Sequence, residues 1–95
     1  EGPGMIDTIV LFYTEREGKE WVAQRRKLDP KRCLIITPRR IDKVRGHGNV
    51  VAFHNPAEIP LGCREVAVIL ACFNEPRMNR SRVLRDFVLR QVTLT

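Results

Sequence analysis

The sequence lacks the two glycine-rich signatures by which α/β domains commonly bind nucleotides. Neither GxGxxG nor GxxxxGK[ST] occurs in its 95 residues. The first motif places a dinucleotide pyrophosphate at a helix N-terminus, and the second cradles the phosphates of a nucleotide that is hydrolysed. Their absence disfavours a dinucleotide-binding enzyme of the usual kind and a P-loop hydrolase.

Cysteine and histidine are scarce, with three and two residues. Cys33, Cys63 and Cys72 form neither a CxxC pair nor the even set of a disulfide framework. The two histidines and three cysteines do not fall at metal-ligand spacing, so we expect no metal site. Reduced thiols in a cytoplasmic protein are the expected state. Nothing in the sequence indicates a cofactor.

Long apolar runs are missing as well. The run at residues 66–73 is far too short to cross a bilayer, which predicts no membrane span. The start lacks a basic region followed by an apolar one, so we expect no signal peptide. Residues 1–4, Glu-Gly-Pro-Gly before Met5, are typical of a cloning scar. We therefore expect a single domain over residues 5–95.

The apolar run at residues 66–73, VAVILACF, has no polar alternation. This pattern favours a strand covered on both faces, as in a parallel sheet between helices. Similar runs predict further strands over residues 6–13, 33–37 and 49–54. Pro38 ends the second of these, because proline cannot donate to a sheet ladder.

Thr14 and Glu17 have the spacing of a capping box and predict a helix that continues to about Leu28. Trp21 and Arg25 share one face of this helix at helical spacing. We interpret Trp21 as core or rim packing. The stem of Arg25 is expected to lie across the edge of the sheet.

Residues 39–45 predict a short helix, with Gly46 as its C-terminal cap. Two prolines and a glycine make residues 55–62 a loop. The last helix is expected from about Asn79 or Ser81 to about Gln91, and residues 92–95 alternate as a short edge strand would.

The expected order is therefore β-α-β-α-β-β-α. It indicates a small three-layer, Rossmann-like α/β sandwich with a mainly parallel sheet. The sheet has four strands, or five if the final residues join it.

The charge balance is basic, with 17 Lys and Arg against 11 Asp and Glu and a net charge of +6. This balance permits a nucleic-acid partner, and the alternative is solubility alone. The densest basic cluster consists of Arg39, Arg40, Lys43 and Arg45, called here the 39–45 cluster. Arginines that open a short helix suit a phosphate group. The alternative is a solvated basic turn.

A second candidate site is the carboxyl edge of the sheet, where open parallel sheets bind ligands. Thr14, His54, Asn74 and Arg77 follow predicted strands and form a candidate pocket edge. The alternative is that they are ordinary polar turn residues. A lone histidine such as His54 is more often structural than a general base, and we assign no catalytic residue.

Two segments resemble parts of RecA-like helicase domains. Residues 8–14, leading into Trp21 and Val22, are similar to one βα unit of such a domain. Residues 34–40, LIITPRR, are similar to the strand-Thr-Pro segment that contacts single-stranded nucleic acid there. The phosphate-binding loop, the acidic metal-binding box and the arginine finger of that family are absent, so ATPase activity does not carry over.

A second resemblance extends over nearly the whole chain from Met5. The strand-Thr-Glu-Arg-helix opening and residues 36–46, ITPRRIDKVRG, resemble short uncharacterised proteins of actinobacterial viruses. The resemblance implies a Rossmann-like fold made in the bacterial cytoplasm. It brings no activity and no functional residues.

The sequence thus favours a non-enzymatic binding protein of bacteriophage origin. We expect it to self-associate and to bind nucleic acid or an acidic host protein through a basic surface. The alternative is an enzyme that binds a small molecule or a nucleotide phosphate at the carboxyl edge of the sheet.

Overall fold

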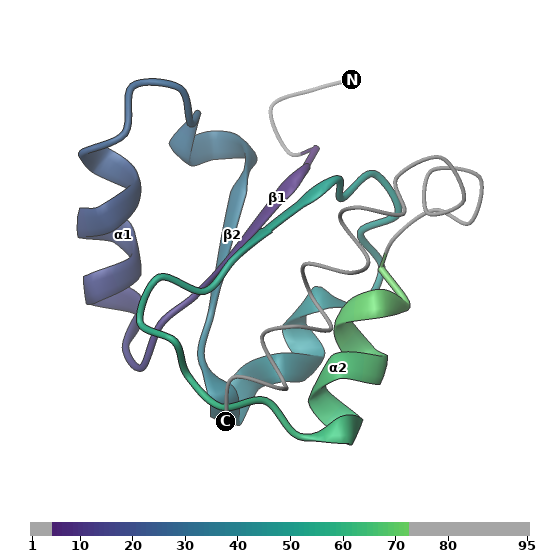
Figure 1. Cartoon of the computed structure of the whole chain (residues 1–95). Helices are drawn as coiled ribbons and strands as arrows, with labels where there is room; N and C mark the ends of the chain where they lie inside the picture. The colour runs from purple at the N-terminus through teal and green to yellow at the C-terminus, as the bar shows by residue number, and fades with distance from the viewer. Residues whose placement is uncertain (1–4, 73–95) are drawn as a thin grey trace.

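The centre of the fold is strand β1 (Thr8–Leu11), whose four residues are all buried. The computed structural model describes residues 5–72 (Figure 1). In it β1 pairs in parallel with β2 (Cys33–Ile36) on one side and with β3 (Ala52–His54) on the other. The sheet order is therefore β2-β1-β3.

Helices cover both faces of this sheet. Helix α1 (Glu15–Ala23) lies on one face, called here the α1 side, and α2 (Cys63–Leu70) lies on the other, the α2 side (Figure 1). The 3₁₀ helix η1 (Pro30–Arg32) leads into β2, and η2 (Pro38–Val44) follows it. The connections through α1 and η2 run in opposite directions across the sheet, so right-handed crossovers place them on opposite faces.

This arrangement confirms the α/β class and the parallel sheet. The expected number of strands was wrong, because the sheet has three strands in the part of the chain that the structure describes. Strands one and three are also shorter than predicted, at Thr8–Leu11 and Ala52–His54. The predicted last helix and the edge strand at residues 92–95 lie outside the described residues.

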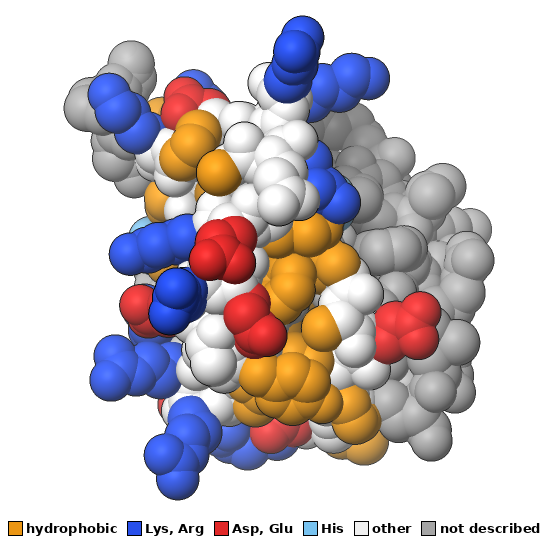
Figure 2. All heavy atoms as spheres, turned by 90° about the vertical axis from the view of Figure 1, so that its left-hand side faces the viewer, with side chains coloured by type: hydrophobic (Ala, Val, Ile, Leu, Met, Phe, Trp, Pro, Cys, Tyr) orange, Lys and Arg blue, Asp and Glu red, His pale blue; other side chains and the backbone are white. Residues whose placement is uncertain are grey.

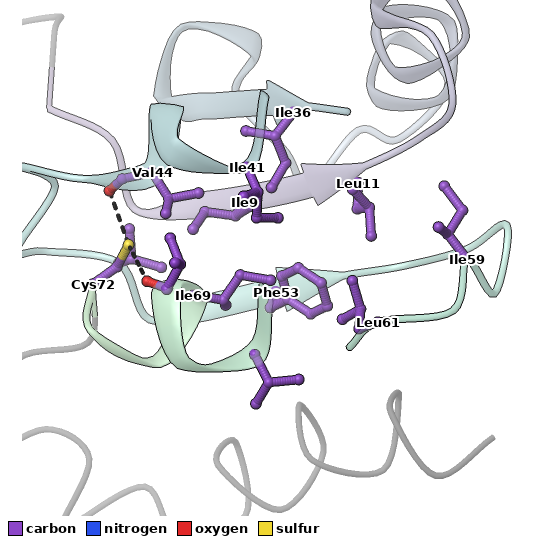
Figure 3. Close-up of a cluster of buried hydrophobic side chains, with 13 residues drawn as sticks. Ile9, Leu11, Ile36, Ile41, Val44, Phe53, Ile59, Leu61, Ile69 and Cys72 are labelled. Atoms are coloured by element: carbon purple, nitrogen blue, oxygen red, sulfur yellow. Dashed lines mark hydrogen bonds between the residues drawn. The ribbon is translucent and has the colours of Figure 1, made fainter. Parts of the chain in front are cut away.

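Alternation along the strands divides the core between the two faces. On the α1 side, Val10, Val22 and Cys33 form a small cluster. On the α2 side the cluster is larger, and Ile9, Leu11 and Phe53 form part of it (Figure 3). The larger cluster anchors η2 and α2 to the sheet.

The run at residues 66–73 was predicted as a strand, and this prediction was wrong. Its first five residues belong to α2. Val66 and Ile69 are buried, whereas Ala67 and Ala71 are exposed. The outward positions are alanines, which count as apolar and so hid the helical period. An apolar run of this length does not distinguish a buried strand from a buried helix segment.

The cap of α1 is as predicted: the backbone N–H of Glu17 donates to the Thr14 hydroxyl at 3.2 Å. The helix ends earlier than expected, at Ala23 instead of near Leu28. The amides of Gln24 and Arg25 bond to carbonyls three residues back, which tightens and ends the helix. Leu28 still packs on the α1-side cluster, from the turn that follows.

The short helix predicted over residues 39–45 is present as η2, a 3₁₀ helix. Its backbone kinks at Arg40, with φ of −117° and ψ of 36°, and it buries Ile41 and Val44. Gly46 has a φ of 89°, the left-handed conformation that glycine adopts freely. The cap predicted at this glycine is therefore consistent with its backbone.

Candidate functional site

The 39–45 cluster lies on η2, and acidic residues neutralise half of it. Lys43 Nζ donates to Glu15 Oε2 at 3.0 Å. This hydrogen bond and the lysine charge lower the pKa of the Glu15 carboxyl below its ordinary value, and the charge of Arg40 adds to the effect. Lys43 is therefore engaged by a carboxylate from the start of α1.

Arg45 is engaged in the same way. Its Nε lies 3.2 Å from Asp42 Oδ1, and Arg64 Nη2 lies 3.2 Å from Asp42 Oδ2. Within residues 5–72, Arg39 and Arg40 form no ion pair, and both side chains are exposed. The cluster thus offers two arginines to a ligand.

The candidate pocket edge is brought together only in part. Thr14 is the N-cap of α1, and its hydroxyl is engaged by Glu17. His54 ends β3 and is half-buried. Asn74 and Arg77 lie outside the described residues.

The loop that follows β3 fills part of the carboxyl edge. Asn55 is buried, its amide donates to the Ile59 carbonyl at 2.8 Å, and its oxygen accepts from the Ile59 N–H at 3.0 Å. Ile59 and Leu61 are 2% and 3% exposed and point toward the core near Leu11 (Figure 3). Ile59 and Leu61 therefore fill this part of the carboxyl edge, where an open parallel sheet would bind a ligand.

A row of rings lies on the α1 side beside β3. The rings of Trp21 and His54 have centroids 5.3 Å apart, tilted by 47°. Phe12 lies on the same ring of Trp21 at 6.1 Å, tilted by 52°. The guanidinium carbon of Arg25 is 4.0 Å from the Trp21 centroid, a cation–π contact. An exposed cation is thus held against an aromatic row fixed by a helix and two strand ends.

Trp21, Arg25 and His54 also line a shallow hollow of about 510 Å³, called here the Trp21 hollow. Its lining residues are Trp21, Gln24, Arg25, Arg26, Lys27, Leu28 and His54. No carboxylate of residues 5–72 forms an ion pair with Arg25, Arg26 or Lys27. Figure 2, which faces the α1 side, shows Lys and Arg side chains gathered along its left-hand part.

Two further groups on the α1 side have shifted pKa values. Burial lowers the pKa of His54 below its ordinary 6.5, and the charge of Arg25 lowers it further. The imidazole is therefore neutral at pH 7, with one nitrogen as donor and one as acceptor. Burial raises the pKa of the Cys33 thiol on the neighbouring core cluster. Neither group is set up as a nucleophile.

A second hollow, also of about 510 Å³, runs beside β2 and is called here the β2 hollow. Apolar side chains supply most of its lining: Val22, Ala23, Pro30, Cys33, Leu34 and Ile35. Glu15, Lys19 and Lys43 complete it. Figure 2 shows an apolar strip between charged side chains on this side of the molecule. β2 is an edge strand of the described sheet, so its outer backbone groups face this side.

The sequence interpretation placed Trp21 in the packing and the Arg25 stem across the edge of the sheet, and it gave no binding role to Arg25, Arg26 and Lys27. A signal was present, because Trp21 and Arg25 are spaced i, i+4 and further cations follow directly. The contact between Trp21 and His54 could not be predicted from the sequence, because it depends on β3 lying next to β1.

Comparison with known proteins gives no relative: no family model, no curated protein and no solved structure matches the chain. Among residues 5–72 no group of three or more His, Cys, Asp or Glu side chains has the arrangement to hold a metal ion. In the same part of the chain, no helix combines the length and apolar character needed to span a membrane.

Proposed function

We propose that this protein is a non-enzymatic binding protein that binds nucleic acid through its basic surface. The observation that carries the proposal is the unequal pairing of its cations. Lys43 and Arg45 face carboxylates, whereas Arg25, Arg26 and Lys27 line a hollow without an ion-pair partner in residues 5–72. Unpaired cations that gather at a concave aromatic surface favour a polyanion with exposed rings.

The physical basis is the release of condensed counterions from the phosphate backbone. Each phosphate that a Lys or Arg neutralises steepens the fall of affinity with salt by close to one unit in the double-logarithmic plot. Arg39 and Arg40 lie on η2 and the Trp21 hollow lies on the α1 side. Substitution of Arg39 and Arg40, or of Arg26 and Lys27 at the hollow, therefore shows separately which surface contributes to nucleic-acid binding.

The test is a titration of labelled single-stranded and duplex oligonucleotides at two salt concentrations. We expect salt-steep binding by the native protein and a slope smaller by about two in Arg26→Ala/Lys27→Ala. The matched variant Arg39→Ala/Arg40→Ala removes the same charge from η2. An absence of binding at low salt would overturn the proposal, and a pull-down would then test the acidic host protein.

A gain-of-binding variant complements these losses. Glu15→Gln removes the carboxylate that engages Lys43 and keeps the side chain's shape. If the 39–45 cluster binds phosphate, this variant binds more tightly and with a slope steeper by about one. Unchanged affinity and slope would exclude Lys43 from the interface and leave Arg39, Arg40 and the Trp21 hollow as the candidate contacts.

We also propose that the protein self-associates through the edge of β2. Support comes from the apolar β2 hollow beside that edge, in which Leu34 and Ile35 are half-buried. An uncovered strand edge favours pairing with another chain. Light scattering over a concentration series tests this, with Leu34→Lys as the variant expected to be monomeric. A monomeric native protein at all concentrations would contradict it.

The wider setting is proposed on more general grounds. A central β1 with connections on opposite faces supports the Rossmann-like architecture. All three cysteines are free, which supports a reducing compartment such as the cytoplasm. The bacteriophage origin rests only on the resemblance carried by the strand-Thr-Glu-Arg-helix opening and residues 36–46. Labelling of free thiols in the protein as it is isolated from cells would test the compartment, since reduced cysteines indicate a reducing one.

A further inference from the structure

We propose that the Trp21 hollow receives an unpaired base of a single-stranded nucleic acid, stacked on the guanidinium plane of Arg25. The inference rests on the proposed function and deepens it, because it names the form of nucleic acid and the group that recognises it. The preference for a single strand follows from stacking of a base on Arg25, a contact that the backbone phosphates cannot make.

The first step is the position of Arg25. Its guanidinium lies over the Trp21 ring at 4.0 Å, and its Nη1 donates to the backbone carbonyl of Trp21 at 3.3 Å. The side chain of Arg25 is otherwise exposed. A planar cation is thereby held in place on an aromatic ring before any ligand arrives. Single-stranded bases stack on guanidinium planes as well as on aromatic rings.

The second step is the rigidity of the support. Trp21 is half-buried, and Phe12 and His54 pack on its ring from the ends of β1 and β3. The platform therefore combines one helix with two strands of the sheet. A base that adds to this stack meets a surface already ordered, so little side-chain entropy is lost on binding.

The third step is the charge and size of the hollow. Arg26 and Lys27 follow Arg25 directly and line the same hollow, where they can contact the phosphates that flank a stacked base. The volume of about 510 Å³ lies in the range of about 300–1,000 Å³ that small-molecule sites occupy. His54 contributes a neutral ring at the same place, with a donor and an acceptor for a base edge.

These features distinguish a single strand from a duplex. A duplex presents phosphates to Arg26 and Lys27, but it keeps its bases in its own stack. A single strand presents phosphates and a free base face together. We therefore expect the hollow to hold single strands more tightly than duplexes of equal charge.

The experiment compares three probes: a single-stranded oligonucleotide, its duplex, and an abasic single strand of the same length. Labelled probes give affinities, and the emission of Trp21, the only tryptophan of the chain, reports on the hollow itself. We expect the intact single strand to change the Trp21 emission and to bind at least about tenfold more tightly than the abasic strand.

Arg25→Lys is the deciding variant, because it keeps the charge and removes the plane. We expect it to lose about tenfold in affinity for the intact single strand and to leave the abasic strand unaffected. Arg16→Lys, at an exposed position of α1 outside both cation clusters, is the matched control and should change neither affinity. Both side chains are exposed, so both variants are expected to fold normally.

Equal affinity for intact and abasic strands, or an unchanged Trp21 emission, would overturn the stacking proposal while leaving salt-dependent phosphate binding in place. Stronger binding of the duplex would overturn it as well. Failure of all three probes to bind at low salt would instead overturn the proposed function. The two failures are therefore distinguishable.

Discussion

Gly18 of α1 lies directly against Ile35 of β2. A Cβ atom built on this glycine would overlap Cγ2 of Ile35, with Cγ1 only 3.3 Å away. Gly18 is buried in the middle of the helix, where glycine is a poor helix former. The close approach of helix and strand therefore explains its presence.

Gly18→Ala tests this contact. Helix propensity alone would stabilise the variant by about 1 kcal/mol, whereas overpacking against Ile35 costs about 1–3 kcal/mol. We expect a net loss of unfolding free energy, measured by urea denaturation. The exposed neighbour Lys19→Ala is the control and should stay within about 0.5 kcal/mol of the native protein. A stabilised Gly18→Ala would show that α1 shifts freely on the sheet.

Asn55 should be the most sensitive residue of the loop after β3. Its side chain holds both the N–H and the carbonyl of Ile59, and Asn55→Ala leaves these buried groups without partners. We expect a loss of about 2–3 kcal/mol in unfolding free energy. Ala57→Ser, exposed in the same loop, is the control. A loss below about 0.5 kcal/mol in Asn55→Ala would mean that water replaces both bonds.

The stability of the protein should depend on pH through His54. Burial and Arg25 lower the pKa of this imidazole in the folded protein, so the unfolded chain binds the proton first as the pH falls. The free energy of unfolding therefore decreases as the pH drops below about 6.5 and levels off below the folded-state pKa. Urea denaturation between pH 5 and 8 measures the effect.

His54→Gln should remove this component of the pH dependence, and His47→Gln should keep it. Identical pH profiles for the native protein and His54→Gln would show that His54 titrates alike in the folded and unfolded chains.

The three thiols should react at very different rates. Burial raises the pKa of Cys72 to about 11, and its thiol donates to the Val44 carbonyl at 2.8 Å (Figure 3). Burial also raises the pKa of Cys33. Because the thiolate is the reactive form, a disulfide reagent at pH 8 should modify the exposed Cys63 first. Cys63→Ser should abolish this fast phase.

Denaturation in guanidinium should bring all three thiols to the fast rate. If Cys72 reacts as quickly as Cys63 in the folded protein, the C-terminal end of α2 opens readily.

Local signals in the sequence were sufficient for much of the fold. Thr14 and Glu17 marked the start of α1, and the apolar runs at residues 9–12 and 33–36 marked strands β1 and β2. Each of these features depends on neighbours within a few residues. The third strand was found but predicted too long. Val50 forms only an isolated β-bridge, and Val51 separates it from the strand Ala52–His54.

The identity of α2 was not predictable by the same means. Val66 and Ile69 face the core three residues apart, but Ala67 and Ala71 on the outer face are apolar too. A polar residue at either position would have revealed the helical period. The error added one strand to the predicted sheet and left out a helix on the α2 side.

The candidate site shows a related limit. The 39–45 cluster was visible as a run of cations, but its pairing with Glu15 and Asp42 depends on how α1 and η2 meet. The Trp21 hollow needs β3 beside β1, which is a matter of strand order. Composition indicates how many charges a chain carries, whereas tertiary contacts decide which of them remain unpaired.

The order β2-β1-β3 has a consequence for how the chain folds. Thr8 pairs with Cys33 on one side and with Ala52 on the other, so the first strand made has no partner close to it in sequence. During synthesis β1 is complete before β2 and β3 are made. It stays without a strand partner until the connection through α1 brings β2 alongside it. Parallel pairings of this kind fold more slowly than local contacts do. We expect that delay to expose the apolar residues of β1 to aggregation while the chain is being made.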